Sequence, residues 1–326
     1  MASGSKVLVR SPASTANLGP GFDSLGMALG LHAWIEMAEA DETRITLYGD
    51  ELEGVACDET NLIYQVAQRV FAESGRRIPH LEIAMYSEIP LARGLGSSAA
   101  AIVGGMVAAN ELIGRPLGPD DIFQMAAREE GHPDNVGASL FGGMVVSSWD
   151  GERAERIRLT PPPQLEALVV IPEFRLSTET ARRVLPSAVP LRDAVFNIGN
   201  ASLLVAAFAS GNLSVLRHAM KDALHQPYRA KLIPGMERIL REAADYGALG
   251  VALSGAGPTL IAFLDENSPD KERLERYLVA SFRAERIEAR TMRLKPDPEG
   301  THLLTPPDRN STFIVNVQRL KGELRA

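Results

Sequence analysis

The chain has 326 residues, of which 45% are hydrophobic and 23% charged, with a formal net charge of −7 and a pI of about 5.5. At about 150 residues per domain this length predicts two domains with sizeable cores, and the acidic balance argues against a nucleic-acid partner, which would require a basic surface. The single cysteine, Cys57, excludes an intrachain disulfide and a cysteine-based metal site.

The N-terminal segment lacks the apolar core of a signal peptide, and no run approaches the about 18 apolar residues of a membrane span, so we expect a cytoplasmic protein without a membrane partner. Residues 6–10 predict a first strand, and the Pro- and Gly-rich residues 11–26 predict a loop. That loop carries Asn17 and Asp23. The residues alone fit a solvated connector with Asx-turns as well as a rigid loop that presents both side chains to a ligand.

Residues 27–37 and 44–48 predict two strands, and residues 61–73 predict a helix with Asn61 as its cap. A strand over 81–86, a loop with glycines at 94 and 96, and a helix over 98–111 then make a cradle for phosphate. Glycine permits close backbone approach, and a helix start supplies unpaired N–H groups and partial positive charge.

The phosphate loop is not of the Walker type, because Ser97-Ser98 stands where that motif has Lys-Ser or Lys-Thr. The two hydroxyls suit hydrogen bonding to phosphate, and one of them suits a magnesium ion. The competing explanation is a Gly, Ala and Ser turn that lets a helix pack closely on a sheet.

Polar side chains crowd the end of the next helix, which is predicted over residues 120–130 with Asp120 as its cap. Glu130, His132, Asp134 and Asn135 follow one another around Gly and Pro. A charged helix end plus a turn explains each residue singly, whereas the set indicates a polar site. A hairpin around Asp150-Gly151 comes next, and three prolines at 161–163 predict a boundary between a domain of residues 1–162 and a second of residues 163–304.

The second half begins with a strand over 165–171 and a short helix that Ser177 would cap. Thr178 and Arg182 share a face of this helix, and their hydroxyl and guanidinium suit a carboxylate, unless Arg182 is a solvated surface side chain. We expect further helices over 191–210 (buried), 213–224, 234–246 and 270–284, and strands over 248–253, 260–264 and 286–292. Residues 305–326 form an extension of unknown role, with a strand and a short helix expected over 311–326.

Three segments, in order, resemble the motifs of the GHMP kinases in the form found in homoserine kinases. They are Pro-Ala-Ser-x-x-Asn-Leu-Gly-x-Gly-Phe-Asp from Pro12, Gly-Leu-Gly-Ser-Ser-Ala-Ala from Gly94, and Ser-Gly-Ala-Gly-Pro-Thr from Ser254. The resemblance covers about residues 6 to 304. It implies an α+β, two-domain GHMP kinase fold, with a ribosomal S5 domain 2-like N-terminal domain and a ferredoxin-like C-terminal domain.

The resemblance further implies phosphorylation of the L-homoserine side-chain hydroxyl by ATP and Mg²⁺, in threonine biosynthesis, by a homodimer. Ser98 and Glu130 would hold Mg²⁺, with Glu129 as a less favoured substitute. Asn135 stands where mevalonate kinase and galactokinase have an Asp, and it would orient the hydroxyl without acting as a base. The implied substrate contacts are Asn17, Asp23, His132, Asn135, Thr178, Arg182, Arg229 and Gly255. The implied nucleotide contacts are Asn61, Pro90, Leu91, Ala92, Arg93, Gly94, Leu95, Gly96, Ser97, Ser98, Ala99 and Ala100.

Two alternatives stay open at this point. One is a GHMP kinase for another small alcohol, such as mevalonate or a sugar, which would lack the ammonium group that Asp23 would bind. The other is a non-catalytic ligand-binding protein on the same fold, against which the intact Ser97-Ser98 pair and Glu130 argue.

Overall fold

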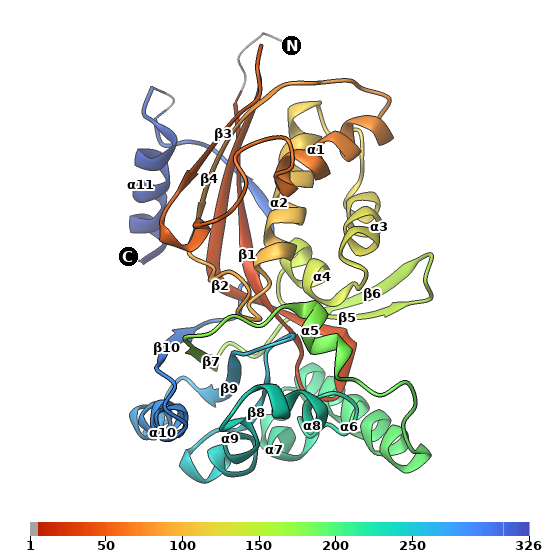
Figure 1. The fold of residues 1–326 in the computed structure, drawn as a ribbon, viewed down its shortest axis with the longest axis vertical. Helices are drawn as coiled ribbons and strands as arrows, with labels where there is room; N and C mark the ends of the chain where they lie inside the picture. Colours follow the sequence, from red (N-terminus) through yellow and green to blue (C-terminus); the bar gives the residue numbers. More distant parts are fainter. Residues whose placement is uncertain (1–5, 309, 326) are drawn as a thin grey trace.

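The first of two sheets dominates the upper half of the molecule in Figure 1, a computed structural model that describes residues 6–308 and 310–325. Its path runs β11-β1-β2-β4-β3, and β5 and β6 continue from β2. The pair β3–β4 is parallel and the others are antiparallel. The strands are β1 (Val7–Asn17), β2 (Gly21–Glu39), β3 (Arg44–Tyr48), β4 (Leu81–Ser87), β5 (Met144–Trp149), β6 (Ala154–Leu159) and β11 (His302–Leu304).

Four helices cover one face of this sheet: α1 (Leu62–Glu73), α2 (Ser97–Leu112), α3 (Pro119–Glu130) and α4 (Asp134–Phe141). Helix α2 is rich in Ala and Gly and contacts β1, β2 and the other three helices, so it is buried over most of its surface. Small side chains allow this close packing on several sides. Its N-terminus is thereby held at the lower edge of the first sheet, facing the second (Figure 1).

The second sheet consists of β7 (Leu165–Pro172), β8 (Gly250–Leu253), β9 (Leu260–Asp265) and β10 (Ala289–Leu294), in the order β10-β7-β9-β8 with antiparallel pairs. A helical stretch joins β7 to β8, and α10 (Lys271–Ala284) joins β9 to β10. This connectivity confirms the ferredoxin-like prediction. The helical stretch contains α5 (Thr178–Arg183), α6 (Leu191–Ser210), α7 (Leu216–Ala219), α8 (Gln226–Arg229) and α9 (Met236–Glu242).

The loop expected over residues 11–26 is mostly strand. Residues 11–17 extend β1 and residues 21–26 open β2, and the two pair with register shifts at Pro12/Ala13 and Ala16/Asn17. Proline is tolerated in a strand at such a bulge, where the ladder is already interrupted. The connection shrinks to a turn over residues 18–20. Asn17 and Asp23 therefore lie near each other at the joined ends of two strands.

Two expectations about the second half are wrong. Helix α6 exists but is not buried, since Leu191, Val195 and Ile198 are 80%, 60% and 66% exposed. Residues 213–224 are not one helix: a short 3-10 turn leads into α7, and a loop follows. In that loop the carboxylate of Asp222 accepts backbone N–H groups, which favours an irregular backbone over a continuing helix.

A cap predicted for the helix after residue 118 is also wrong. Asp121, rather than Asp120, accepts the backbone N–H of Gly118 at 2.9 Å. Asp120 instead pairs with Arg153 and Arg156. The helix begins at Pro119, so Asp121, not Asp120, occupies the third helical position from which a side chain can cap. Asp120 is left to pair with the two arginines.

The C-terminal segment returns to the first sheet. Strand β11 pairs with β1, so residues 302–304 lie in the first sheet, although the sequence places them at the end of the second domain. Residues 311–326 are not a strand and helix, because α11 (Phe313–Arg325) occupies the described part. It covers the sheet face opposite α2 (Figure 1), where Phe313 and Val317 pack with Leu8 and Trp34. The boundary predicted from the sequence, with domains over residues 1–162 and 163–304, remains a prediction.

Candidate active site

Three turns meet between the two sheets around a cavity of about 320 Å³. They are the β1–β2 turn, the loop before α2 and the β8–β9 turn. Backbone hydrogen bonds join them: Ser14 N donates to Leu95 O at 3.1 Å, and Gly255 N donates to Ala16 O at 3.1 Å. The three motifs recognised in the sequence are therefore fixed relative to one another by their own main chain.

The loop before α2 has the geometry of an anion cradle. Gly94 and Gly96 have φ of 77° and 68°, and a Cβ on either would clash with Ser254 O or Ser14 Oγ. Only glycine suits both positions. The N-cap of α2 is Gly96, which has no side chain to occupy the first N–H groups of the helix. The cavity is lined here by Ala92, Gly94, Gly96, Ser97 and Ser98.

The other residues expected around the nucleotide do not line this cavity. Asn61 is buried, and its amide is engaged within the protein: Oδ1 accepts from Ile63 N at 2.9 Å, and Nδ2 donates to Ala56 O at 2.7 Å. The Arg93 guanidinium donates to the carbonyl of Pro172. The full set outside the lining is Asn61, Pro90, Leu91, Arg93, Leu95, Ala99 and Ala100.

Ser98 and Glu130 meet at the start of α2 and the end of α3. Ser98 Oγ donates to Glu130 Oε2 at 3.0 Å. Burial raises the pKa of the Glu130 carboxyl, against the opposing effects of His132 and of the Ser98 hydrogen bond. Glu129 instead pairs with Arg69, away from the cavity. Glu130 and Ser98 thus offer the oxygen ligands that Mg²⁺ prefers, and a cation would relieve the cost of a half-buried carboxylate.

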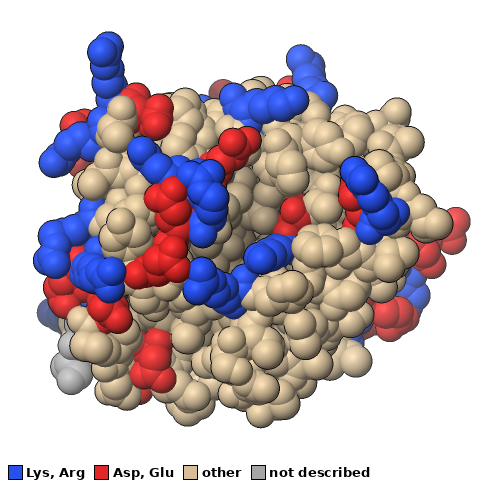
Figure 2. Space-filling model, turned by 90° about the horizontal axis from the view of Figure 1, so that it is seen from below, with Lys and Arg blue, Asp and Glu red and all other residues tan. Residues whose placement is uncertain are grey.

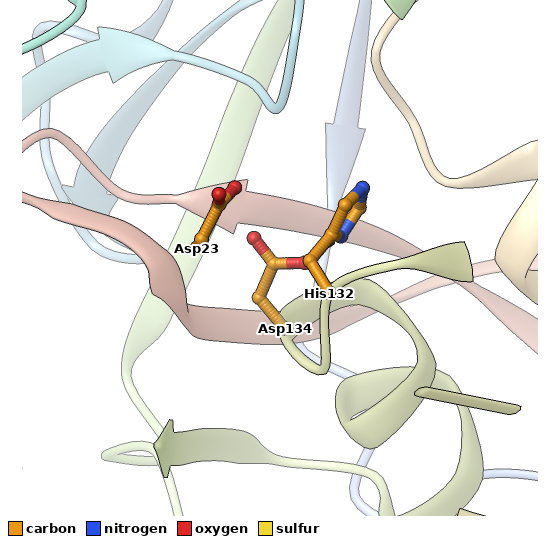
Figure 3. Close-up of side chains that lie close together, drawn as sticks. All are labelled: Asp23, His132 and Asp134. Atoms are coloured by element: carbon orange, nitrogen blue, oxygen red, sulfur yellow. Dashed lines mark hydrogen bonds and ion pairs between the residues drawn. The ribbon is translucent and has the colours of Figure 1, made fainter. Parts of the chain in front are cut away.

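His132 stands beside two carboxylates, those of Asp134 and Asp23 (Figure 3). Its Nδ1 lies 2.7 Å from Asp134 Oδ1. Burial acts to lower the pKa of His132, but the Asp134 hydrogen bond and charge, helped by Glu130 and Asp23, raise it overall. Asp134 belongs to the polar cluster recognised in the sequence, but no binding or catalytic role was predicted for it. The potential ligand atoms of Asp23, His132 and Asp134 lie within 4.8 Å of one another, close enough to coordinate one metal ion together.

Asn135 follows Asp134 at the start of α4 and lines the cavity. Its backbone N–H donates to Asp134 Oδ1 at 2.6 Å, and its Oδ1 accepts from Ser14 Oγ at 2.9 Å. The amide oxygen is thereby occupied. The NH₂ group has one long contact, 3.5 Å to Asp134 Oδ1, and its second N–H remains for a ligand. An amide in this position can orient a hydroxyl but cannot take its proton at neutral pH.

Asp23 and Arg182 form a two-bond ion pair across the cavity, with Nη1–Oδ2 and Nη2–Oδ1 distances of 3.0 and 2.7 Å. Asn17 supports Asp23, since its Oδ1 accepts from Asp23 N at 3.0 Å while its Nδ2 donates to Gly255 O at 2.9 Å. Asn17 and Asp23 have φ of 69° and 55°, a left-handed conformation uncommon outside glycine. Strain held at a ligand-facing turn is typical of functional sites.

A second guanidinium, that of Arg229, reaches the cavity from α8. It is only 2% exposed, and its Nε and Nη1 donate to Ala181 O and Gly255 O, each at 3.1 Å. Burial and the nearby Arg182 lower the pKa of Arg229 to about 10. Both arginines therefore remain charged at neutral pH. The lining on this side is completed by Leu176, Ser177, Thr178, Ala256 and Gly257.

Every residue predicted to contact the substrate lines this one cavity: Asn17, Asp23, His132, Asn135, Thr178, Arg182, Arg229 and Gly255. The two residues predicted to hold the metal, Ser98 and Glu130, line it as well. The residues predicted to bind phosphate, metal and the substrate carboxylate are thus brought together around one cavity.

Known proteins resemble the chain over most of its length. Residues 61–143 match the model of the GHMP kinases N terminal domain, and residues 204–283 match the GHMP kinases C terminal model. A homoserine kinase of Deinococcus radiodurans is 46% identical over 90% of this chain and 95% of its own length, and one of Moorella thermoacetica is 45% identical over 90% and 98%. A solved homoserine kinase from Cytophaga hutchinsonii superposes with a TM-score of 0.83 at 29% identity, covering 93% of this chain and 99% of that one.

Proposed function

We propose that this chain, which belongs to the GHMP kinase family and within it to the homoserine kinases, transfers the γ-phosphoryl group of ATP to the side-chain hydroxyl of L-homoserine. The observation that carries the proposal is one cavity that joins a phosphate cradle to Asp23, Arg182 and Arg229. The product would be O-phospho-L-homoserine, an intermediate of threonine biosynthesis.

The charges opposite the phosphate cradle match a small amino acid. Its ammonium would face Asp23, and its carboxylate would face Arg182 and Arg229, each a charge-assisted interaction. In the structure Asp23 and Arg182 bond to each other. A zwitterion placed between them would replace that ion pair with two new ones. Mevalonate could form an ion pair only with the arginines, and a neutral sugar could form none.

The triphosphate would lie on the N-terminal amides of α2, with Ser97 and Ser98 as hydrogen-bond partners. Ser98 and Glu130 would hold Mg²⁺, whose charge, when bound, offsets that of the transferring phosphate. The raised pKa of the half-buried Glu130 carboxyl and its 3.0 Å contact with Ser98 support this choice over Glu129, which is paired with Arg69.

Asn135 would orient the acceptor hydroxyl through its NH₂ group, because its oxygen is held by Ser14. Phosphoryl transfer depends chiefly on position and charge neutralisation, so a protein base is not required. The hydroxyl proton would pass to a phosphate oxygen.

A coupled assay of ADP release tests the proposal with L-homoserine, mevalonate, galactose or no acceptor. We expect ADP release that depends on L-homoserine and Mg²⁺. Activity only with mevalonate or galactose would assign a different substrate, and no release with any acceptor would favour a non-catalytic binding protein. A cytoplasmic location is part of the proposal, since a chain with one cysteine has no need of an oxidising compartment.

We also propose a homodimer formed through α6. This helix is long and apolar enough to cross a membrane by length and composition. One side is tied to the body of the protein, however, by Asn197 bonded to Pro20 O at 2.7 Å and Asn200 bonded to Lys221 O at 3.0 Å. Its exposed apolar residues are Leu191, Val195, Phe196, Ile198 and Leu203.

Charged side chains are densest on the side of α10 in Figure 2. On α6 itself the charged residues are Arg192 and Asp193, both in the first turn. A two-fold axis through the exposed face of α6 would pack its apolar side chains against the same residues of a second chain. Light scattering should give twice the 35.2 kDa chain mass, and Ile198→Glu should halve it. A wild-type monomer at assay concentration would contradict the dimer without touching the kinase assignment.

A further inference from the structure

A buried histidine behind the cavity contacts Arg229. His225 is 0% exposed and directly precedes α8. Its ring stacks on Phe22, with centroids 5.2 Å apart and an interplanar angle of 27°. Nε2 lies 2.7 Å from Gly19 O, and Nδ1 lies 3.2 Å from Arg229 Nη1. The ring thus bridges the β1–β2 turn and the helix that carries Arg229.

The two partners fix the tautomer of this ring. A carbonyl oxygen can only accept, so Nε2 must carry the proton that reaches Gly19 O. A guanidinium can only donate, so Nδ1 must offer its lone pair to Arg229 Nη1. A doubly protonated ring would turn Nδ1 into a donor facing a donor, and would place two positive charges side by side in a buried site.

The charges around His225 come from three segments. Asp222, in the loop before α8, lies 3.6 Å from Nε2, but its carboxylate already accepts the backbone N–H groups of His225 and Gln226 at 2.9 and 2.6 Å. Arg229 lies on α8, and Asp23 lies on β2. Burial lowers the pKa of His225 most, Asp222 opposes this, and Arg229 lowers the pKa further. The neutral ring is favoured at neutral pH.

The bond to His225 completes the restraint of the guanidinium. Nε is held by Ala181 O, and Nη1 is shared between Gly255 O and His225 Nδ1. Among the described residues, Nη2 makes no hydrogen bond, and Arg229 lines the cavity. Nη2 is therefore the donor left for a ligand carboxylate.

We propose that His225 is a positioning residue, which as the neutral Nε2–H tautomer holds the guanidinium of Arg229 for the substrate carboxylate. The inference rests on the proposed function, because it takes L-homoserine as the ligand of Arg229. It predicts that the L-homoserine site, and not the ATP site, weakens when Nδ1 loses its lone pair by substitution or by protonation.

The test measures kcat and KM for L-homoserine and for ATP between about pH 5.5 and pH 8.5 in the wild type, His225→Asn and His225→Leu. At neutral pH, His225→Leu should raise KM for L-homoserine about tenfold, as expected for an Arg that loses an acceptor, and should leave KM for ATP unchanged. His225→Asn keeps an oxygen that can accept near Nδ1, so it should stay within about threefold of the wild type.

The pH profile separates positioning from packing. In the wild type, KM for L-homoserine should rise only at a pH below the ordinary His value of about 6.5, because burial lowers the pKa of His225 and only the protonated ring cannot accept from Arg229. His225→Asn should lack this rise. The raised pKa of His132 places its own titration at higher pH, and both enzymes share it.

Equal KM values for L-homoserine in the wild type and His225→Leu would overturn the inference. So would a His225→Asn variant as impaired as His225→Leu, or a parallel rise in KM for ATP. If His225→Leu fails to fold, as judged by its melting curve, the acid limb of His225→Asn decides alone, and a limb identical to that of the wild type overturns the inference. A wild type inactive toward L-homoserine overturns the proposed function and this inference together, whereas an active wild type with unaffected variants overturns this inference alone.

Discussion

The guanidinium of Arg182, on α5, forms two parallel hydrogen bonds of 2.7 and 3.0 Å with the carboxylate of Asp23, on β2. The pair joins the two sheet-centred halves of the molecule at the cavity. Both side chains are about one-third exposed, so water can reach them and the pair can open. The ammonium of a bound zwitterion would pair with Asp23 and its carboxylate with Arg182. The ion pair is therefore what we expect of an amino-acid site without its ligand.

Arg182→Ala should therefore weaken the binding of L-homoserine. Losing one charge-assisted partner costs about 1.5–3 kcal/mol, which is roughly tenfold or more in affinity. Steady-state kinetics should show a raised KM for L-homoserine and an unchanged KM for ATP. If the two KM values rise together, Arg182 is structural or belongs to the nucleotide side.

Glu130→Gln should lower kcat strongly and raise the Mg²⁺ concentration needed for half-maximal activity, because an amide is a weaker ligand than a carboxylate. Ser98→Ala should act in the same direction. Glu129→Gln is the matched control, since Glu129 pairs with Arg69 outside the cavity and should leave the Mg²⁺ dependence unchanged. A wild-type Mg²⁺ titration in Glu130→Gln, or a shifted one in Glu129→Gln, would refute the assignment of the metal site.

The residues that line the cavity were more predictable from the sequence than the bounds of the strands and helices around them. Gly94, Gly96 and Ser98 could be recognised because a phosphate cradle depends on local backbone geometry, which short motifs encode. His225 could not be found this way, since its role also depends on burial and on a contact with Gly19, 206 residues away, that only the folded chain creates. Asn61 shows the opposite case: its capping role was predicted from local physics, and the structure uses its amide for that purpose.

Fold errors arose where tertiary pairing overrides local signals. Residues 11–17 contain a proline and small polar residues, which favour a loop locally, yet pairing with β2 makes them a strand. Helix α6 was expected to be buried because it is apolar, but hydropathy cannot tell a core helix from one that faces another molecule. Phe313 and Val317 on α11 lie beyond the span of the resemblance, so nothing in the motifs indicated that they cover Trp34.

Helix α11 should contribute directly to stability. Phe313→Ala removes a buried aromatic ring from the cluster with Trp34 and Tyr48, and should lower the free energy of unfolding by about 3–5 kcal/mol. Urea denaturation measures this, with Gln318→Ala, an exposed position on the same helix, as the control. Equal midpoints for the wild type and Phe313→Ala would show that the extension does not stabilise the first sheet.

His132 should make stability depend on pH with a definite sign. Its pKa is raised in the folded protein, mainly through Asp134 acting against burial. The stabilisation is therefore fully present below the unfolded pKa of about 6.5 and is lost as pH rises through the folded value. The difference in unfolding free energy between the wild type and His132→Asn should thus be larger at about pH 6 than at about pH 8.5. A difference that grows with pH would contradict the raised pKa.

Asn135→Asp should lower kcat, although it supplies the carboxylate that other members of the fold are expected to use as a base. The new charge would stand next to Asp134, whose Oδ1 lies 3.5 Å from the side-chain nitrogen Nδ2 of Asn135, and close to the transferring phosphate. Repulsion in such a site outweighs the gain of a base that phosphoryl transfer does not require. The wild-type profile of kcat at saturating Mg²⁺ should also lack an acidic limb from a carboxylate base between about pH 5 and pH 8. The measurement is kcat against pH for both enzymes, with Asn135→Ala as the variant that removes the amide without adding charge. A faster Asn135→Asp enzyme with a new acidic limb would show that a base at this position is feasible and beneficial, and the explanation offered for the amide would then be wrong.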